Sequence, residues 1–496
     1  MSTFRPSDNR IFLIASFLVV VSAVFLRLYH IEERSLWLDE AKSANFARGT
    51  FAETLSNTQL HDSAPIAHPF VLYVAQKIGE GPLAVRFPSF MASVLAVMVM
   101  LGLVYAKIEW RAAIFSALML AVSASQVFYA QEVRSYALSV LFGALLLWAF
   151  LYYVSNESKR KGLILLCPLL FLAPLIQYGL VLFGFGILSA MGILYFVGHP
   201  ATIRIHHVIL SGFCLGVGGL LSLLITLRHQ LRIISIQVGA EGRRAHYFDP
   251  GVDNPVWFIM KNSYDLVTFI FPGVYILSLI FMALMVYAYR MVGLRKWDPT
   301  FVLAFTSLSV AISAAFLGVY PYSGTRQCLY LAPVLILAAA ISLSYVLGRL
   351  RGFDRPAATI AVLAVIALSG FSDIKNTNPY QEVEDSKTVL EHLARSMSPH
   401  DEVYFYYGAR PAIDFYLKKQ DKRFIYGVSH RDDPKEYVTD LLDGVKQETD
   451  RLWLVFSHVV REEDQLIITG LKSGWDVAAV SSVPGAALYV ANRKVR

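Results

Sequence analysis

The sequence predicts a polytopic α-helical membrane protein with a small α/β soluble domain at its C-terminal end. Of the 496 residues, 56% are hydrophobic and only 16% are charged. The mean hydropathy of +0.51 is too high for a soluble chain of this size. Beyond Ser372 the composition changes to that of a soluble domain. We therefore predict a transmembrane domain over residues 1–372, with an outer loop at 30–84, and a soluble domain over 373–496.

About eleven segments are candidates for membrane spans, because a spanning helix needs about 20 mostly apolar residues. The first is expected to be a retained helix, since no small-residue cleavage site follows it. Dividing residues 163–197 into two spans depends on the short turn Gln177-Tyr178-Gly179, and a single helix there would reverse the sides of all later segments. The spans are expected at residues 11–29, 85–106, 112–130, 136–154, 163–178, 179–197, 207–226, 268–289, 300–320, 328–347 and 356–372.

Basic residues between these spans predict the topology, because cytoplasmic loops are enriched in Lys and Arg. The net charge of +7 is dispersed and forms no basic run, so we expect no nucleic-acid partner. With the N-terminus inside, the candidate site and the C-terminal domain face the periplasm, and the protein is a multi-pass inner-membrane protein surrounded by lipids. The cytoplasmic connections then carry Lys107 and Arg111, Lys159-Arg160-Lys161, Arg204, Arg290 with Arg295 and Lys296, and Arg349 with Arg351 and Arg355.

Strands alternate with helices in the soluble domain, which favours a small α/β layer. We expect this domain to cover or shape a site, because its sequence contains no catalytic motif. The expected helices are Ser386 to Ser396, Pro411 to Lys418 and Asp464 to Ser473, and the expected strands are Glu402 to Tyr407, Arg451 to Ser457 and Ala486 to Ala491.

Two adjacent carboxylates, Asp39 and Glu40, follow Trp37 just after the first apolar segment. Residues Ala41 to Leu55 have apolar positions at helical spacing, which predicts an interfacial helix with the acidic pair in its first turn. Two interpretations are open for the pair alone. The carboxylates either complement the helix dipole or take part in catalysis.

On the predicted topology, charged residues from separate segments reach one membrane–water boundary. Ionisable residues there are costly and usually mark a site or a pathway, although each arginine alone is equally well explained as a snorkelling anchor. Together the charges fit a reaction in which a carboxylate takes a proton while guanidinium groups hold a departing phosphate. The residues are Asp39, Glu40, His61, Asp62, Glu132, Arg134 and Arg326.

Four strings in this region resemble the bacterial branch of the GT-C glycosyltransferases. They are Trp-x-Asp-Glu ending at Glu40, Asp62-Ser63-Ala64-Pro65, the string from Ala84 to Ser89, and the string from Tyr129 to Leu138. That branch is similar to protein O-mannosyltransferases and the lipid A aminoarabinose transferase, glycosyltransferase families 39 and 83. The resemblance is close over residues 10–155, and Gly324-Thr325-Arg326 resembles the later phosphate-side turn. Of the four strings, the one from Tyr129 to Leu138, Tyr-x-Gln-Glu-x-Arg-x-Tyr-Ala-Leu, is specific for this branch.

The resemblance implies a GT-C fold and transfer of a sugar from a polyprenyl-phosphate donor to a hydroxyl of a lipid, glycan or protein. The transfer would invert the anomeric carbon and occur at the periplasmic face. By position Asp39 is the base, with Glu40 beside it, and the arginines contact the phosphate or order the loop around it. The residues implied at the substrate are Asp62, Glu132, Arg134, Tyr136 and Arg326.

The sequence departs from the pattern of these relatives in two places. Ser63-Ala64-Pro65-Ile66 stands where relatives commonly have His-Pro-Pro-Leu, which argues against a role for His61 or His68 there. Gln327 replaces the Tyr or His that often follows the later arginine.

The residue types suit the implied chemistry. One carboxylate opposite the leaving group is enough for inversion through an oxocarbenium-like state, and arginine stabilises the growing phosphate charge with two parallel hydrogen bonds. A divalent cation stays open as a cofactor, because Glu40, Asp62 and His61 offer ligands but match no metal motif.

Two functions from other classes are also open. A transporter or flippase of lipid-linked saccharides should show paired half-repeats, and no repeat is visible. An external sensor or scaffold with the soluble domain as its receptor would make Asp39 dispensable.

Overall fold

The computed structural model forms two compact units, which we call the helical unit and the α/β unit. The helical unit comprises Met1–Tyr29, Phe51–Ala75 and Arg86–Pro379, and the α/β unit comprises His30–Thr50, Gln76–Val85 and Tyr380–Arg496. The structure describes residues 6–155, 159–198, 203–239, 244–271, 273, 280, 283–284, 286–287, 290, 297–349, 354–417, 421–430, 433 and 436–494.

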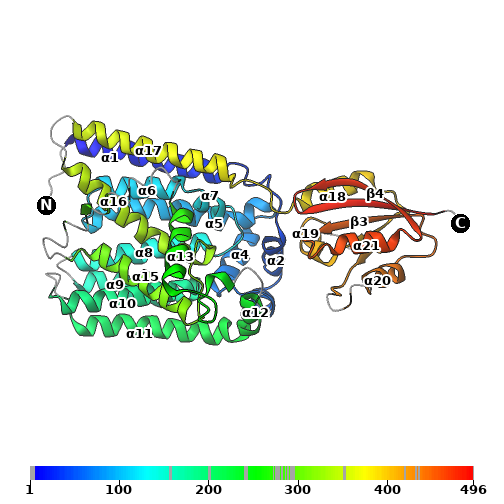
Figure 1. Cartoon of the computed structure of the whole chain (residues 1–496), viewed down its shortest axis with the longest axis horizontal. Coiled ribbons are helices and arrows are strands. Elements are labelled where there is room, and N and C mark those ends of the chain that lie inside the picture. Colours follow the sequence, from blue (N-terminus) through cyan, green and yellow to red (C-terminus); the bar gives the residue numbers. More distant parts are fainter. Residues whose placement is uncertain are drawn as a thin grey trace. The chain divides into compact units, whose positions relative to one another are not determined.

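Long apolar helices make up most of the helical unit, and many of them run in a common direction (Figure 1). The N-terminal elements are α1 (Pro6–Leu28), α3 (Phe51–His61), α4 (Ala67–Ile78), α5 (Pro82–Leu101), η1 (Gly102–Ala106), α6 (Trp110–Val122), α7 (Ala124–Ala130), α8 (Tyr136–Ser155), α9 (Lys159–Ile176) and α10 (Gly179–Phe196). They are followed by α11 (Ile205–Ser222), η2 (Leu223–Leu227), α12 (Arg228–Gly239), η3 (Arg244–His246), α13 (Pro255–Ile270), α15 (Pro299–Phe316), η4 (Arg326–Leu331), α16 (Ala332–Gly348) and α17 (Asp354–Thr377).

Eight helices within the described ranges are long and apolar enough to cross a membrane, and α6 with α7 forms a ninth candidate that bends by 62°. These nine correspond to predicted spans. The predicted division of residues 163–197 into two helices is confirmed as α9 and α10. Helix α10 is among the nine candidates, whereas α9 is not, and its first turn contains Lys159-Arg160-Lys161. The predicted span at 268–289 lies largely outside the described residues.

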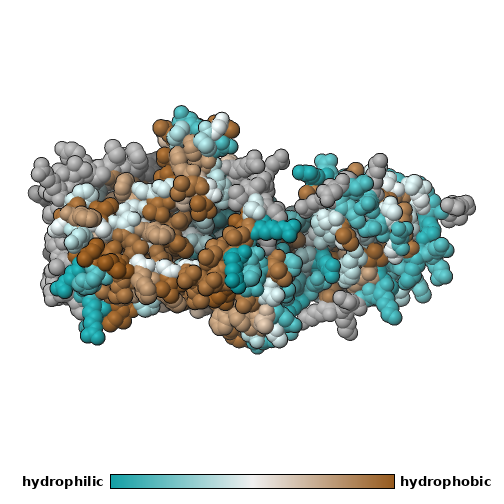
Figure 2. All heavy atoms as spheres, turned by 90° about the horizontal axis from the view of Figure 1, so that it is seen from below, coloured by the Kyte–Doolittle hydropathy of each residue, from teal (hydrophilic) through white to brown (hydrophobic). Residues whose placement is uncertain are grey.

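Apolar side chains cover much of the surface of the helical unit, as expected for a protein surrounded by lipid (Figure 2). Phe17 and Phe25 on α1 are 68% and 64% exposed, and Phe213 on α11 is 67% exposed. Large contiguous apolar surfaces are rare on soluble monomers. The predicted class, a polytopic α-helical membrane protein, is confirmed.

Arg27 stabilises the break between α6 and α7. Its side chain is fully buried, and its Nη1 and Nη2 atoms donate to the backbone oxygens of Ala121 and Leu120 at 2.9 and 3.0 Å. Its Nε atom donates to Ser93 Oγ at 2.7 Å. The last carbonyls of a helix have no partner within that helix, so the guanidinium supplies the donors that the end of α6 lacks.

The interfacial helix predicted over Ala41 to Leu55 is wrong in its extent. The chain forms α2 (Leu38–Phe46) and α3, with a turn at residues 47–50 between them. Gly49 lies in this turn, and glycine disfavours a helix interior by about 1 kcal/mol relative to alanine. The acidic pair does occupy the first turn of α2, as predicted. A second amphipathic helix, α4, covers residues Ala67–Ile78.

A five-stranded sheet organises the α/β unit, with strand order β2-β1-β3-β5-β4. The strand β1 pairs in parallel with β2 and β3, while β5 pairs antiparallel with β3 and β4. The strands are β1 (Glu402–Phe405), β2 (Phe424–Tyr426), β3 (Arg451–Ser457), β4 (Trp475–Val483) and β5 (Ala486–Arg493), and the helices that accompany them are α18 (Ser386–Ser396), η5 (Tyr407–Ala409), α19 (Arg410–Tyr416), α20 (Glu436–Gly444) and α21 (Glu463–Leu471).

Both faces of this sheet are covered by helices. Tyr404 and Tyr406 belong to a buried cluster with apolar residues of α20 and α21. Val403 and Phe405 belong to a second cluster with residues of α18 and α19. Because successive side chains of a strand point to opposite faces, this alternation gives a three-layer unit with a core on each side.

The last helix of the helical unit ends near residue 373, where the sequence predicts that a soluble domain begins. Helix α17 continues to Thr377, and the α/β unit resumes at Tyr380. Parts of the predicted outer loop, His30–Thr50 and Gln76–Val85, also group with the α/β unit.

Candidate functional site

Arg134 and Asp62 form a buried ion pair in the helical unit. Arg134 Nη1 donates to Asp62 Oδ1 at 3.0 Å and to Oδ2 at 2.9 Å, and the two side chains are only 11% and 8% exposed. The backbone N–H of Ser63 also donates to Asp62 Oδ1 at 2.7 Å. Pro65 disfavours continuation of α3, so Asp62 lies where the chain leaves the helix and turns toward Arg134.

The positive charge of Arg134 lowers the pKa values of two nearby groups, Asp62 and His68. Burial alone would raise the pKa of Asp62, but Arg134, His68 and the hydrogen bonds outweigh it and hold the pKa below its ordinary value. Burial and the positive charge of Arg134 lower the pKa of His68 to about 4, against the opposing effect of Asp62. His68 is therefore a neutral imidazole at neutral pH, and it forms a hydrogen bond with the backbone of Val133.

Tyr136 and Arg326, which are far apart in sequence, lie next to each other. The Cζ atom of Arg326 is 5.4 Å from the centre of the Tyr136 ring, a cation–π geometry. The Tyr136 ring also contacts Tyr129 edge-on, with ring centres 5.3 Å apart. Because Tyr136 begins α8 and Arg326 begins η4, the contact joins two of the sequence motifs.

The turn before Arg326 packs closely against α13. A Cβ atom at Gly324 would lie 2.3 Å from the backbone oxygen of Asp265, so only glycine fits there without a shift of the backbone. Nearby, Tyr322 Oη and Ser263 Oγ are 2.8 Å apart, and Tyr322 N donates to His246 O at 2.9 Å. These contacts fix the position from which Arg326 extends.

The segment from Gln131 to Arg134 is held at the end of α1. Gln131 Nε2 donates to the backbone oxygens of Arg27 and Tyr29 at 3.0 and 2.7 Å. Both Gln131 and Glu132 are almost completely buried. The carboxylate of Glu132, two residues before Arg134 in the sequence, is thus enclosed in the protein.

Asp39 and Glu40 lie in the first turn of α2, in the α/β unit. Glu40 is fully buried, whereas Asp39 is only partly buried. Within this unit α2 packs beside α19 (Figure 1). Asn45 Nδ2 donates to Pro411 O at 2.8 Å, so the C-terminal end of α2 is joined to the first turn of α19.

The structure thus brings together Asp62 with Arg134 and Tyr136 with Arg326. Sequence reasoning argued against a role for His68 and did not indicate that this side chain is buried. It also missed Arg27 and Arg86, which are fully buried. A charged residue inside or next to an apolar segment is the signal that identifies such arginines.

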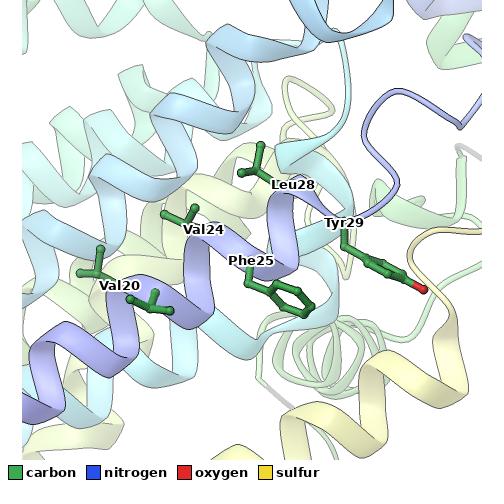
Figure 3. A pocket seen from close by; sticks show the side chains of 6 residues that line it. Val20, Val24, Phe25, Leu28 and Tyr29 are labelled. Atoms are coloured by element: carbon green, nitrogen blue, oxygen red, sulfur yellow. The ribbon is translucent and has the colours of Figure 1, made fainter.

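Two surface grooves of the helical unit contain none of the predicted site residues. One is lined by Val20, Val21, Val24, Phe25, Leu28 and Tyr29. The labelled side chains in Figure 3 come from α1, except that of Tyr29, which directly follows this helix. The other lies along α10 and α15 and is lined mainly by apolar residues, serines and Thr306. Neither groove is lined by a charged side chain.

Across the described ranges, no three His, Cys, Asp or Glu side chains are grouped so that they could hold a metal ion.

Comparison with known proteins supports the resemblance indicated by the motifs. The family described as dolichyl-phosphate-mannose-protein mannosyltransferase matches residues 63–227, a segment that includes Glu132, Arg134 and Tyr136. Comparison with curated protein sequences gave no match.

Solved structures of low sequence identity share the fold over most of the chain. ArnT from Cupriavidus metallidurans in the apo state is 14% identical, with a TM-score of 0.56 over 96% of this chain and 97% of that protein. The same enzyme bound to undecaprenyl phosphate gives a TM-score of 0.54 at 14% identity and the same coverage. The archaeal oligosaccharyltransferase AglB from Archaeoglobus fulgidus, in complex with an inhibitory peptide and a dolichol-phosphate, is 10% identical, with a TM-score of 0.55 over 98% of this chain and 74% of that protein.

The chain therefore has an ArnT-like GT-C fold, as the motifs predicted. The resemblance to the GT-C glycosyltransferases is confirmed by the family match and the structural matches together.

Proposed function

We propose that this protein is an inverting glycosyltransferase that moves a sugar from a polyprenyl-phosphate donor to an acceptor hydroxyl at the periplasmic face of the inner membrane. The observation that carries the proposal is the buried Arg134–Asp62 pair, in which a carboxylate orients a guanidinium. Arginine is well suited to bind phosphate. The fold is shared with an ArnT bound to undecaprenyl phosphate and with AglB bound to dolichol-phosphate, which supports a lipid-phosphate donor.

In the proposed reaction the acceptor hydroxyl gives its proton to the carboxylate of Asp39. The hydroxyl oxygen forms a bond to the anomeric carbon on the side opposite the phosphate. The bond between the anomeric carbon and the phosphate oxygen breaks, and its electron pair leaves with the polyprenyl phosphate. This single displacement inverts the anomeric carbon. No second carboxylic acid is needed, because phosphate leaves well without protonation.

We assign the donor phosphate to Arg134 and Arg326. The Asp62 carboxylate holds Arg134 by accepting from Nη1, and the Tyr136 ring lies beneath the Arg326 guanidinium. Glu132 belongs to the buried segment that precedes Arg134. Such fixed donors stabilise charge that develops on a leaving group, because they need little reorganisation during the reaction.

The acidic pair would act from α2. Asp39 is only partly buried, which suits a base that must meet an acceptor hydroxyl, whereas Glu40 is fully buried. We assign Glu40 a supporting role in the first turn of α2. The acceptor is a lipid, a glycan or a protein that presents a hydroxyl group.

The test is the substitution Asp39→Asn in the full-length protein reconstituted in liposomes. Release of undecaprenyl phosphate would be measured from a panel of undecaprenyl-phosphate sugars, with membrane extract as the acceptor source. Loss of a general base should lower the transfer rate by about 10²- to 10⁴-fold. The matched control is Glu53→Gln, because Glu53 is an exposed acid in the first turn of α3.

Equal rates for Asp39→Asn and the wild-type protein would remove Asp39 as the base and support the helix-dipole interpretation. If wild-type protein moved the donor across the bilayer without releasing undecaprenyl phosphate, the transporter interpretation would replace the enzyme.

A further inference from the structure

Three backbone N–H groups just before Asp39 are held by side chains from the C-terminal part of the α/β unit. Ser35 N donates to the Glu382 carboxylate at 3.1 and 3.0 Å, and Leu36 N donates to Tyr416 Oη at 2.8 Å. Leu38 N donates to Glu384 Oε2 at 2.8 Å. All of these residues belong to the same unit, so the α/β unit is built partly from the loop that carries the acidic pair.

Glu384 is the most constrained of these partners. Its side chain is only 8% exposed, and while Oε2 binds the N–H of Leu38, Oε1 binds Nδ1 of His458. Both carboxylate oxygens are therefore engaged. A buried carboxylate with two such partners holds one orientation, because rotation would break both hydrogen bonds.

The bond to Leu38 acts at the start of α2. Leu38 is the first residue of this helix, and Trp37, the residue before it, provides no side-chain cap. The first N–H groups of a helix have no partner within it, and a negative charge at this end is favourable. Glu384 therefore serves as a cap supplied from a distant part of the chain, next to Asp39.

The opposite end of α2 is fixed to the same unit. Arg48, just beyond the helix, donates to the backbone oxygens of Asp414 and Phe415, which lie in the last turn of α19. Its guanidinium carbon is 4.8 Å from the centre of the Phe415 ring. Since both ends of α2 are attached, the direction of its first turn is set by the α/β unit.

We propose that Glu384 is a positioning residue for Asp39, and that the α/β unit thereby orients the base. The inference depends on the proposed function for the role of Asp39, but the hydrogen bond from Leu38 to Glu384 does not. The proposal gives the C-terminal elements of the α/β unit an indirect part in the transfer reaction. Glu384 itself contacts the backbone of α2 and not the reacting atoms.

The experiment compares Glu384→Ala with Glu384→Gln in the full-length protein. Gln retains a side-chain oxygen that can accept from Leu38 N, whereas Ala removes the acceptor. Asp385→Ala is the matched control, because Asp385 is the acid that directly follows Glu384 and its side chain accepts from Thr388 N, at the start of α18. Two measurements are made on each variant: the kinetics of transfer, and hydrogen–deuterium exchange of peptides that cover residues 35–40.

For Glu384→Ala we expect faster exchange at residues 35–40 and a kcat lower by about 100-fold, since a displacement of about 1 Å near a reacting group can cost this much. The donor KM should change by less than about threefold, because the donor phosphate contacts are not altered. Glu384→Gln should recover most of the kcat and of the protection. Asp385→Ala should leave both unchanged.

Each alternative outcome has a distinct meaning. Unchanged exchange at residues 35–40 in Glu384→Ala would overturn the claim that this carboxylate holds α2. Faster exchange with an unchanged kcat would overturn the positioning role while leaving Asp39 as the base. If Asp39→Asn were fully active, the proposed function would fail, yet the exchange experiment would still report whether Glu384 fixes the loop.

Discussion

The buried imidazole of His68 should make the stability of the protein depend on pH. Burial and Arg134 lower its pKa to about 4 in the folded state, from an ordinary value of 6.5. The unfolded chain therefore binds more protons than the folded chain between these two values. Because stability rises with pH wherever the unfolded state binds more protons, the protein should lose stability as the pH falls from about 6.5 to about 4.

The size of this loss follows from the interval between the two pKa values. One pKa unit corresponds to about 1.36 kcal/mol, so the full interval gives about 3 kcal/mol. Asp62 acts in a different range. Its lowered pKa stabilises the fold above the unfolded value of about 3.8, and this contribution is lost only as the pH falls further, through the folded pKa. The window between pH 6.5 and pH 4 thus reports mainly on His68 rather than on Asp62.

The assay is the free energy of unfolding in mixed detergent micelles at pH 7 and at pH 4.5, for wild-type protein and His68→Gln. Gln cannot take up a proton, so the difference between the two pH values should shrink by about 2–3 kcal/mol in this variant. His61→Gln is the control, because His61 is a neighbouring but exposed histidine. His61→Gln should keep the pH dependence of the wild-type protein. The reasoning is refuted if His68→Gln keeps it as well.

Two further substitutions test the groups assigned to the donor phosphate. Arg134→Ala should weaken donor use and destabilise the protein by about 3–5 kcal/mol, because it leaves a buried carboxylate without its cation; an unchanged donor KM and kcat would exclude Arg134 from the phosphate. Gly324→Ala places a Cβ atom 2.3 Å from the Asp265 backbone oxygen and should lower transfer by about tenfold or more through displacement of the adjoining arginine. Gly216→Ala, at a site with open space around the new atom, should leave transfer unchanged, and equal activity of the two glycine variants would contradict the argument.

The elements that the sequence predicts in the α/β unit are those with a strong burial pattern. Strand β3 is buried at six of its seven positions, and its apolar run is visible from sequence. Strands β2 and β4, which the sequence analysis missed, are the two edges of the sheet. An edge strand has fewer buried side chains, and β4 alternates between buried and exposed positions only weakly. The signal that identifies a strand is therefore weakest at the edges.

The candidate residues were predicted from motifs, whereas their pairing required the structure. Composition and the Tyr-x-Gln-Glu-x-Arg string identify Arg134, but they do not indicate that Asp62 is its partner, 72 residues earlier. The same applies to Glu384, which is separated from Leu38 by 346 residues. Contacts of this kind depend on how the chain folds as a whole, and no local periodicity encodes them.

Asp62 in the helical unit and Glu384 in the α/β unit are held in the same way. Each is a buried carboxylate that is engaged at both oxygens, and each holds a group that the proposed reaction uses: the guanidinium of Arg134 in one unit and the first turn of α2, with Asp39, in the other. Burying a carboxylate is costly unless hydrogen bonds or a charge compensate it. Here hydrogen bonds compensate each carboxylate, which can then hold its partner in one geometry, and a preorganised group needs little rearrangement in the transition state. Substitution of either carboxylate should therefore affect kcat more strongly than its distance from the reacting atoms would suggest.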